Sequence, residues 1–315
     1  MRRGPTRELI SLGLIGAGPS WERRYRAAVK RLSHRLCIRV VHDPVLGRAQ
    51  LAAQESGAEV VAGLKQALCH PGLNGVLVLD AGWYGFAPLE FACEHQRPAF
   101  LAGNWSSPPK DWWQWHLAAQ ERGLMFVPEL SWRFQPSTTR LRELIASRLG
   151  PVRQIHIEIS VPSESGADVL TNALAGAVDW CGYLSRQSPD VFSSIHTANG
   201  SGSAFQLSFR PDLRGVQLEP AKVELVQNPG SCREDAPQFR AVVTCEQGEA
   251  SIDGPTAIRW KTWHSLEGNE QLDQERTEEE VMLDQFCRRL VGGLIPTATF
   301  QDVALALDHV SRLSQ

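Results

Sequence analysis

The sequence has no apolar run long enough to cross a lipid bilayer. Its apolar stretches, such as Leu12–Ile15 and Val76–Leu79, end far short of the roughly 20 residues that a membrane span requires. The basic N-terminus leads into only a short apolar run without a cleavage pattern, so we expect no secretory signal. Charge of one sign is also lacking, because 32 Lys and Arg stand against 35 Asp and Glu. This balance argues against nucleic acid or an anionic membrane as a partner, and we predict a cytoplasmic protein.

Closely spaced cysteine pairs are absent as well. The seven cysteines are an odd number, are widely dispersed and form no C-x-x-C motif, so we expect reduced thiols that behave as small core residues. No group of His, Cys, Asp and Glu has the spacing of metal ligands, and we predict no metal.

The first part of the chain alternates apolar runs with stretches of helical composition, and its 315 residues are enough for two domains. Residues 9–15 form an apolar run of strand length, the sequence Gly16-Ala17-Gly18 turns the chain, and Pro19 opens a helix. Further strands are expected at 37–41, 59–61, 76–79, 99–101 and 124–127. Strands separated by helices imply right-handed crossovers. We therefore predict a doubly wound parallel sheet over residues 1–135.

The hydrophobic period changes after about residue 150. Within 152–161 the apolar residues Ile155, Ile157 and Ile159 alternate with polar ones, so one face of this strand is buried and the other is not. The elements expected after it are strands at 204–210, 215–226, 239–245 and 249–253, a loop at 227–237, and helices at 277–291 and 300–313. We predict an α+β domain over residues 136–315, built on an open, mainly antiparallel sheet.

Several local strings occur in a specific order along the chain. They are Leu14-Ile15-Gly16-Ala17-Gly18, Asp43-Pro44, Trp132-Arg133-Phe134-Gln135-Pro136, Leu149-Gly150-Pro151-Val152 and Gly248-Glu249-Ala250-Ser251. Together with the order of elements, they resemble the Gfo/Idh/MocA family, the glucose-fructose oxidoreductase and inositol dehydrogenase group. The resemblance covers nearly the whole chain. It implies a Rossmann domain that binds NAD or NADP, an α+β domain whose open sheet forms oligomer interfaces, and hydride transfer at a hydroxyl-bearing carbon of a sugar or cyclitol.

The glycine turn matches a dinucleotide-binding motif only in part. In G-x-G-x-x-G, the first glycine allows the bend, the second lets the backbone approach the pyrophosphate, and the third allows close packing of helix and strand. Gly16 and Gly18 fill the first two places, whereas the third is Trp21, and Pro19 removes one backbone N–H. Two interpretations remain open: a phosphate cradle that includes Ser20, or a tight turn with Trp21 packed against the domain.

Asp43 ends the second expected strand. An acidic residue there can accept hydrogen bonds from an adenosine ribose and disfavours a 2′-phosphate, so NAD is favoured over NADP as a cofactor. The alternative is an Asp-Pro turn that opens the next helix.

The catalytic groups that the resemblance implies are missing. Its lysine, after the fifth strand, aligns with Gly103 in Ala102-Gly103-Asn104. Its aspartate and histidine, four residues apart on one helical face, align with Asn172 and Gly176, if Asp179 is the acidic residue that follows them. The stretch 80–85 also lacks the family's histidine. Because a positioned base typically contributes about 10²–10⁴-fold, we expect ordinary family chemistry to be absent.

Other side chains are candidates for a substrate cleft. We expect Trp105, Arg133 and Asp179 to line it, with Trp105 offering a flat stacking surface to a sugar or a base. Trp112 and Trp115 are expected to bury against the sheet. No spacing singles out a replacement base, and the side chains considered for that role are His116, His156, His196, Tyr84 and Lys110.

Three hypotheses follow. The first is a divergent, non-dehydrogenase protein that keeps a nucleotide- or sugar-binding cleft and serves in binding, regulation or as a partner subunit. The second is an NAD-dependent oxidoreductase of a sugar or cyclitol with relocated acid-base residues. The third, compatible with either, is that the open sheet face carrying His156 and Glu158 is a homo-oligomer interface.

Overall fold

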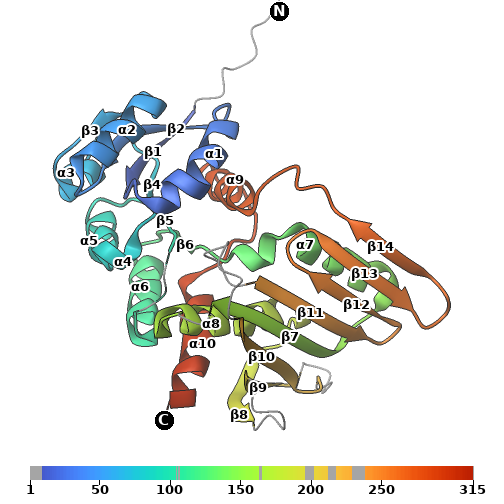
Figure 1. Ribbon diagram of the computed structural model, residues 1–315. Helices are drawn as coiled ribbons and strands as arrows, with labels where there is room; N and C mark the ends of the chain where they lie inside the picture. Colours follow the sequence, from blue (N-terminus) through green and yellow to red (C-terminus); the bar gives the residue numbers. More distant parts are fainter. Residues whose placement is uncertain are drawn as a thin grey trace, which may run out of the picture. The chain divides into compact units, whose positions relative to one another are not determined.

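The computed structural model describes residues 9–103, 105, 107–162, 165–195, 202–211, 218–228 and 238–314 (Figure 1). The chain divides into two compact units. Unit 1 comprises Met1–Glu129 and Arg276–Gln301, and unit 2 comprises Leu130–Glu275 and Asp302–Gln315. Where the sequence placed a single boundary after residue 135, the chain thus leaves unit 1 after residue 129 and returns to it for residues 276–301.

Unit 1 contains a six-stranded parallel sheet in the order β3-β2-β1-β4-β5-β6. The strands are β1 Ile10–Ile15, β2 Leu36–His42, β3 Glu59–Val60, β4 Gly75–Val78, β5 Ala99–Leu101 and β6 Phe126–Pro128. The helices are η1 Trp21–Tyr25, α1 Arg26–Arg31, α2 Leu46–Ser56, α3 Leu64–Leu68, α4 Ala81–Tyr84, α5 Ala87–Glu94, α6 Pro109–Glu121 and α9 Glu278–Leu290. The order reverses between β1 and β4, as in a doubly wound sheet. This architecture confirms the predicted fold class of the first domain.

The helix after β1 is held by an apolar face and by ion pairs. Trp21 and Tyr25 are 4% and 0% exposed, so this stripe packs into unit 1, as a buried amphipathic face does. On its other side, Arg31 pairs with Glu280 of α9 at 2.8 Å. The α9 helix starts with a reciprocal capping box between Thr277 and Glu280, which fixes its first turn against α1.

Unit 2 contains an eight-stranded mixed sheet in the order β14-β13-β12-β11-β7-β10-β9-β8. The strands are β7 Val152–Pro162, β8 Pro189–Ile195, β9 Gly202–Phe209, β10 Ala221–Asn228, β11 Gln238–Cys245, β12 Gly248–Asp253, β13 Ala257–Thr262 and β14 Glu267–Gln271. The remaining helical elements are η2 Ser131–Phe134, α7 Pro136–Leu144, η3 Ile145–Leu149, α8 Ala167–Ser185, α10 Phe300–Ser311 and η4 Arg312–Ser314. Only the β7–β10 pair is parallel among the described pairs of this sheet. The open, mainly antiparallel sheet was predicted correctly.

Burial along β7 follows the predicted alternation, because Ile155, Ile157 and Ile159 are at most 1% exposed. The expected strand at 215–226 is observed as β10, which begins at Ala221, while residues 212–217 lie outside the described residues. The loop expected at 227–237 was placed two residues too early, because β10 continues to Asn228, and its remainder falls on residues that the structure does not describe.

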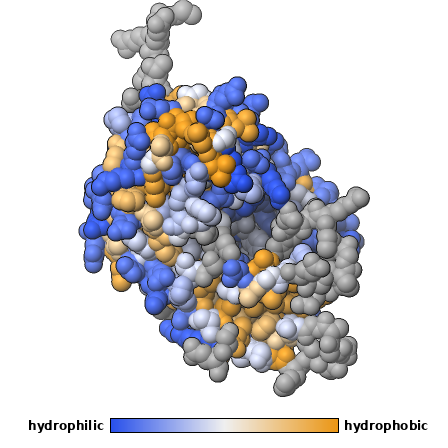
Figure 2. All heavy atoms as spheres, turned by 60° about the vertical axis from the view of Figure 1, so that its left-hand side comes forward, coloured by the Kyte–Doolittle hydropathy of each residue, from blue (hydrophilic) through white to orange (hydrophobic). Residues whose placement is uncertain are grey.

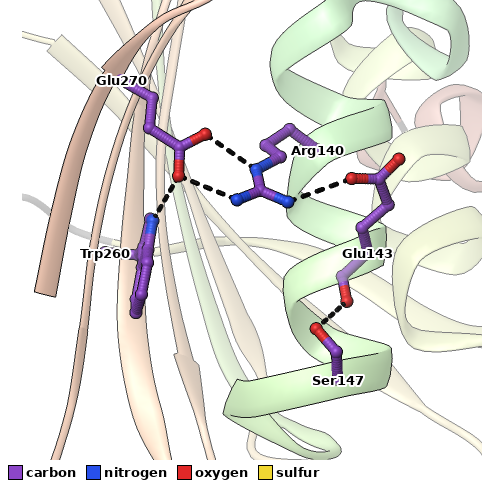
Figure 3. A network of polar contacts seen from close by, with 5 residues as sticks. All are labelled: Arg140, Glu143, Ser147, Trp260 and Glu270. Carbon is purple, nitrogen blue, oxygen red and sulfur yellow. Dashed lines mark hydrogen bonds and ion pairs between the residues drawn. The ribbon is translucent and has the colours of Figure 1, made fainter. Parts of the chain in front are cut away.

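The apolar face of the second sheet carries α7 and α8. On this face the Trp180 ring meets Phe239 edge to face, with centroids 5.0 Å apart, and its indole N–H donates to Thr138 Oγ1 over 3.0 Å. At the outer strands, Arg140 of α7 donates to both carboxylate oxygens of Glu270 on β14, at 2.7 and 2.9 Å (Figure 3). Trp260 donates to the same carboxylate. These contacts attach α7 to the edge of the sheet.

The opposite face of this sheet is polar. His156 Nε2 lies 3.1 Å from Glu224, and Arg240 donates to Asp253 over 2.8 Å. A hollow of about 640 Å³ lies over this face, and Arg259 lines part of it. The surface of unit 1 is more mixed: Val45, Leu46 and Leu51, at α2, are 48–58% exposed. Figure 2, which turns the α2 and α3 side forward, shows apolar surface among hydrophilic side chains.

The cysteines depart in one respect from the expectation. Among the described cysteines, Cys93, Cys181, Cys245 and Cys287 are buried, as small core residues should be. Cys69 is exposed, so its interpretation as a core residue was wrong. Across the described residues, no helix combines the length and the apolar character that crossing a membrane demands.

Candidate functional site

The glycine turn after β1 has backbone geometry that few other residues could adopt. Gly16 has a φ of +85°, which lies in the left-handed region that glycine tolerates without strain. At Gly18, an added Cβ would come within 2.5 Å of Asp80 Oδ2. The dihedral angle therefore favours glycine at the first position, and at the second position any side chain would displace the Asp80 carboxylate.

The backbone N–H groups of this turn are bound by two carboxylates of the chain itself. The Ala17 N–H donates to Asp43 Oδ2 over 2.7 Å, and the Gly18 N–H donates to Asp80 Oδ2 over 3.0 Å. The carboxylates thus lie where a Rossmann turn offers N–H groups to a pyrophosphate.

Asp43 also forms the turn that sequence reasoning offered as its alternative role. Its Oδ1 accepts a hydrogen bond of 2.7 Å from the Val45 N–H, two residues on, as in an Asx turn. The side chain is 8% exposed. Because both of its oxygens are engaged, Asp43 connects the end of β2 to the glycine turn.

Asp80 was not singled out in the sequence, yet its carboxylate binds the glycine turn directly. It follows β4, the neighbour of β1, and its carboxylate also accepts a hydrogen bond from the Ser20 side chain. Burial raises the pKa of Asp80, Asp43 raises it further, and the Gly18 N–H and Arg48 oppose the rise. The signal available in the sequence was the position of Asp80 at the carboxyl end of a buried strand, where ligands of such sheets bind.

The glycine turn is a poor match for the pyrophosphate of a dinucleotide. A pyrophosphate carries negative charge and needs the N–H groups that Asp43 and Asp80 accept from. Placing it there would bring like charges together at a half-buried site, which is unfavourable. Trp21 is not the obstacle, since it is buried in unit 1 at 4% exposure. The residues present do not fit a pyrophosphate, and the reason is the pair of carboxylates.

The residue that aligns with the expected lysine is Gly103, which has no side chain. Gly103 has a φ of +115°, and its N–H donates to Glu129 Oε2 over 3.2 Å. Glu129 is 7% exposed and pairs with Arg24, which also pairs with Glu279 at 2.7 Å. The guanidinium of Arg24 is thus the charge-balancing partner of two carboxylates. Asn104, the next residue of the string, lies outside the described residues.

In unit 2, the helix α8 carries the three aligned positions. Gly176 faces the ring of Trp132, because an added Cβ would lie 3.5 Å from its Cζ3 atom. The Trp132 ring in turn stacks on Phe239, with centroids 4.6 Å apart. An indole therefore covers the place on α8 where a histidine base would project. Asn172 lies on the same helix, one turn earlier and half-buried.

Arg133 and Asp179, both predicted to line a substrate cleft, bind each other. Arg133 Nε donates to Asp179 Oδ2 over 2.9 Å, and its Nη2 donates to Oδ1. The guanidinium also lies 3.2 Å from Asp302 and stacks on the Tyr183 ring at 4.9 Å. Burial raises the pKa of the Asp179 carboxyl, and Arg133 opposes this rise. The pair is an internal ion pair of unit 2 whose charges are already compensated.

The other candidates are dispersed. Lys110 is exposed, Trp105 is half-buried, and His116 lies against the Trp113 ring at 5.9 Å. Trp112 is buried at 2% exposure, as expected, whereas Trp115 is only half-buried.

Tyr84 and His196 were also considered as candidates for a base. Burial, together with Asp43 and Asp80, raises the pKa of Tyr84, so this hydroxyl keeps its proton at neutral pH and is poorly suited to act as a base. His196 lies outside the described residues.

Comparison with known proteins connects the fold to a family. No protein-family model matches the sequence, and no curated protein matches it in sequence. Solved structures match along nearly the whole chain. UDP-N-acetylglucosamine 3-dehydrogenase GnnA from Acidithiobacillus ferrooxidans has 15% identity and a TM-score of 0.76, covering 97% of both chains.

Two further structures with this fold belong to proteins of different kinds. GenD2 from gentamicin A biosynthesis, in complex with NAD, has 18% identity and a TM-score of 0.73, covering 100% of this chain and 95% of its own. The transcriptional regulator Gal80p from Kluyveromyces lactis has 13% identity and a TM-score of 0.77, covering 99% and 90%. The chain therefore has the two-domain fold of the Gfo/Idh/MocA oxidoreductases, as the sequence strings predicted.

Proposed function

We propose that this protein is a binding or regulatory protein that uses the Gfo/Idh/MocA fold without dehydrogenase chemistry. The observation that carries the proposal is the Asp80 carboxylate, which accepts the Gly18 N–H of the glycine turn. A fold of this kind needs that N–H for the pyrophosphate of its cofactor. A protein whose own carboxylate holds the turn is not built for a nicotinamide dinucleotide.

The α8 helix supports the same proposal independently. Removal of a hydride from an alcohol also requires a group that accepts the hydroxyl proton. Gly176 offers no such group, and the Trp132 ring covers it. Both oxygens of the nearby Asp179 carboxylate accept hydrogen bonds from the Arg133 guanidinium, so a substrate proton would have to compete with this ion pair.

The same fold occurs in a protein described as a transcriptional regulator, Gal80p, so a non-catalytic role has a structural precedent. For the ligand we propose a small sugar-like molecule without a pyrophosphate. Trp105 supports this choice, because an indole face stacks well on the apolar face of a sugar. We also propose that the polar face of the second sheet, with His156 and Glu158, is a homo-oligomer interface. A strictly monomeric mass in light scattering would remove that part.

The test is a thermal-shift titration with NAD, NADH, NADP and NADPH, each at millimolar concentration. A ligand at 100 times its dissociation constant stabilises a protein by about 2.7 kcal/mol, which moves the Tm of a chain of this size by several degrees. We expect no shift for the wild type. The matched variant is Asp80→Ser, which removes the negative charge and frees the Gly18 N–H.

A shift for Asp80→Ser alone would support the proposal and identify the carboxylate as the cause. A clear shift for the wild type would overturn it and favour the second candidate, an NAD-dependent oxidoreductase acting on a sugar or cyclitol hydroxyl. The observation that favours this second candidate is Asp43 at the end of β2, where an acidic residue can bind an adenosine ribose. Polyol turnover would then be the next measurement.

A further inference from the structure

Unit 1 carries a thiol–imidazole pair on its surface. Cys69, the residue directly after α3, is exposed, and its Sγ lies 2.9 Å from Nε2 of His95, the residue directly after α5. A thiol and an imidazole at this distance share a hydrogen bond, and a nucleophile within reach of a base is the arrangement that activates cysteines.

The packing of α3 against α5 fixes this pair. The Lys65 ammonium lies over the Phe91 ring at 5.8 Å. After the two helices, the Arg97 guanidinium donates to the carbonyl oxygens of His70 and Leu73, which ties the two following segments together. Both helix ends are thus anchored on either side of the Cys69–His95 contact.

The buried cysteines provide the contrast. Burial raises the pKa of the Cys245 and Cys287 thiols to about 12, so they are protonated and inert at neutral pH. Cys37 is half-buried, and its sulfur lies 3.7 Å from Ser11 Oγ. Cys69 is the exposed thiol among the described cysteines, and it has an imidazole as its partner. Among the described residues, no group of three or more potential ligands gathers around a metal site.

We propose that Cys69 and His95 form a thiol-exchange site that takes small-molecule disulfides. His95 Nε2 accepts the Cys69 proton, and the sulfur attacks one sulfur of the disulfide, whose S–S bond breaks. The departing thiolate receives the proton from His95. The products are a mixed disulfide on Cys69 and one free small thiol, so no outside oxidant is needed. This site lies within unit 1 and does not depend on the proposed function.

Charged side chains lie on the two helices and on the segments that follow them. Lys65 and Arg97 are cationic, Glu94 precedes His95 in the chain, and His70 Nε2 lies 3.3 Å from Glu59. His70 contacts Glu59 and is next to Cys69 in sequence, but its ring nitrogens bind other groups. It is therefore the matched control for His95.

The first experiment measures alkylation of each cysteine by iodoacetamide at pH 7, with peptide mass spectrometry resolving Cys69 from the others. An ordinary thiol is only a few per cent ionised at this pH, so assistance by His95 should accelerate the reaction about tenfold or more. We expect His95→Gln to remove this acceleration and His70→Gln to keep it. Added imidazole should restore part of the rate in His95→Ala, which a purely structural role would not do.

The second experiment incubates the protein with glutathione disulfide. We expect a mixed disulfide on Cys69 that dithiothreitol reverses, that forms more slowly in His95→Gln, and that does not form at this position in Cys69→Ser. The proposal is overturned if Cys69 reacts no faster than Cys37, if His95→Gln leaves its rate unchanged in a correctly folded variant, or if no mixed disulfide forms at Cys69.

Discussion

The glycine turn of unit 1 and the α8 helix of unit 2 both differ from what the resemblance to the Gfo/Idh/MocA family implies, but in different ways. At the turn, the backbone keeps the geometry of a dinucleotide motif, with Gly16 at a φ of +85°, while Asp80 takes the N–H group. On α8, the backbone is an ordinary helix and the side chain itself is missing at Gly176. At the turn, a carboxylate therefore lies where the motif would leave room for a ligand, whereas on α8 a side chain is absent.

The two regions also differ in how they balance buried charge. The Asp179 carboxylate has a guanidinium partner in Arg133, which is 12% exposed. Burial raises the pKa of both carboxyls, but the group that opposes the rise at Asp179 is the Arg133 ion pair, whereas at Asp80 the opposing groups are the Gly18 N–H, Arg48 and the Ser20 hydroxyl. Breaking a buried ion pair leaves an uncompensated buried charge, whereas removing a carboxyl whose burial disfavours ionisation removes an unfavourable contribution to stability. Removal of the Asp80 charge should therefore stabilise the protein, whereas removal of the Arg133 charge should destabilise it.

The largest effect is expected at the ion pair. Arg133→Met leaves the buried Asp179 carboxylate without its bidentate partner. Removal of one member of such a pair costs about 3–5 kcal/mol, measured as the loss in free energy of unfolding in urea. The double variant Arg133→Met with Asp179→Leu should recover most of this loss, because no unpaired charge remains. A loss below about 1 kcal/mol for the single variant would mean that the pair is solvated.

The next largest effect on stability is expected at Gly18 of the turn, in comparison with Gly47 of α2. Gly18→Ala would place a Cβ 2.5 Å from Asp80 Oδ2. Such overpacking lowers the free energy of unfolding by about 1–3 kcal/mol. The double variant with Asp80→Ala should be less destabilised than Gly18→Ala alone. Gly47 in α2 is the matched control, because a Cβ there meets no atom within 4 Å. Equal effects of Gly18→Ala and Gly47→Ala would contradict the close approach of Asp80.

On α8, replacement of a glycine by alanine should stabilise the folded protein. Gly176 is helical, and its added Cβ would make ordinary van der Waals contact with Trp132 at 3.5 Å. Alanine is favoured over glycine in a helix interior by about 0.5–1 kcal/mol, so we expect Gly176→Ala to raise the free energy of unfolding by that amount. Thermal and urea denaturation both measure it. A destabilised variant would show that this helix needs its glycine for close packing.

The sequence predicted those parts of both regions that depend on local pattern. The buried run of β1 and the alternation along β7 follow from the residues themselves. The strand β14, Glu267–Gln271, escaped prediction because its sequence EGNEQ is polar and lies at the edge of the sheet, where apolar alternation is not required. The bonds that decide the turn, Asp43 to Ala17 and Asp80 to Gly18, join residues 26 and 62 positions apart. No spacing rule connects such distant residues.

The smallest effect tests the charge difference between the regions through pH. The pKa of Asp80 is raised in the folded protein, so this carboxyl favours folding when protonated. Its contribution is present at pH values below the ordinary range of an aspartate and is lost as the pH rises through the folded value. Asp80→Asn keeps a carbonyl acceptor for the Gly18 N–H but cannot ionise.

We expect the Asp80→Asn variant to gain stability over the wild type at pH 7 and to lose that gain near pH 3. The gain should stay below about 1 kcal/mol, because solvent screens this half-exposed group. Urea unfolding across pH 3–7 measures the difference, and an equal gain at both ends of the range would place its cause in packing rather than in charge.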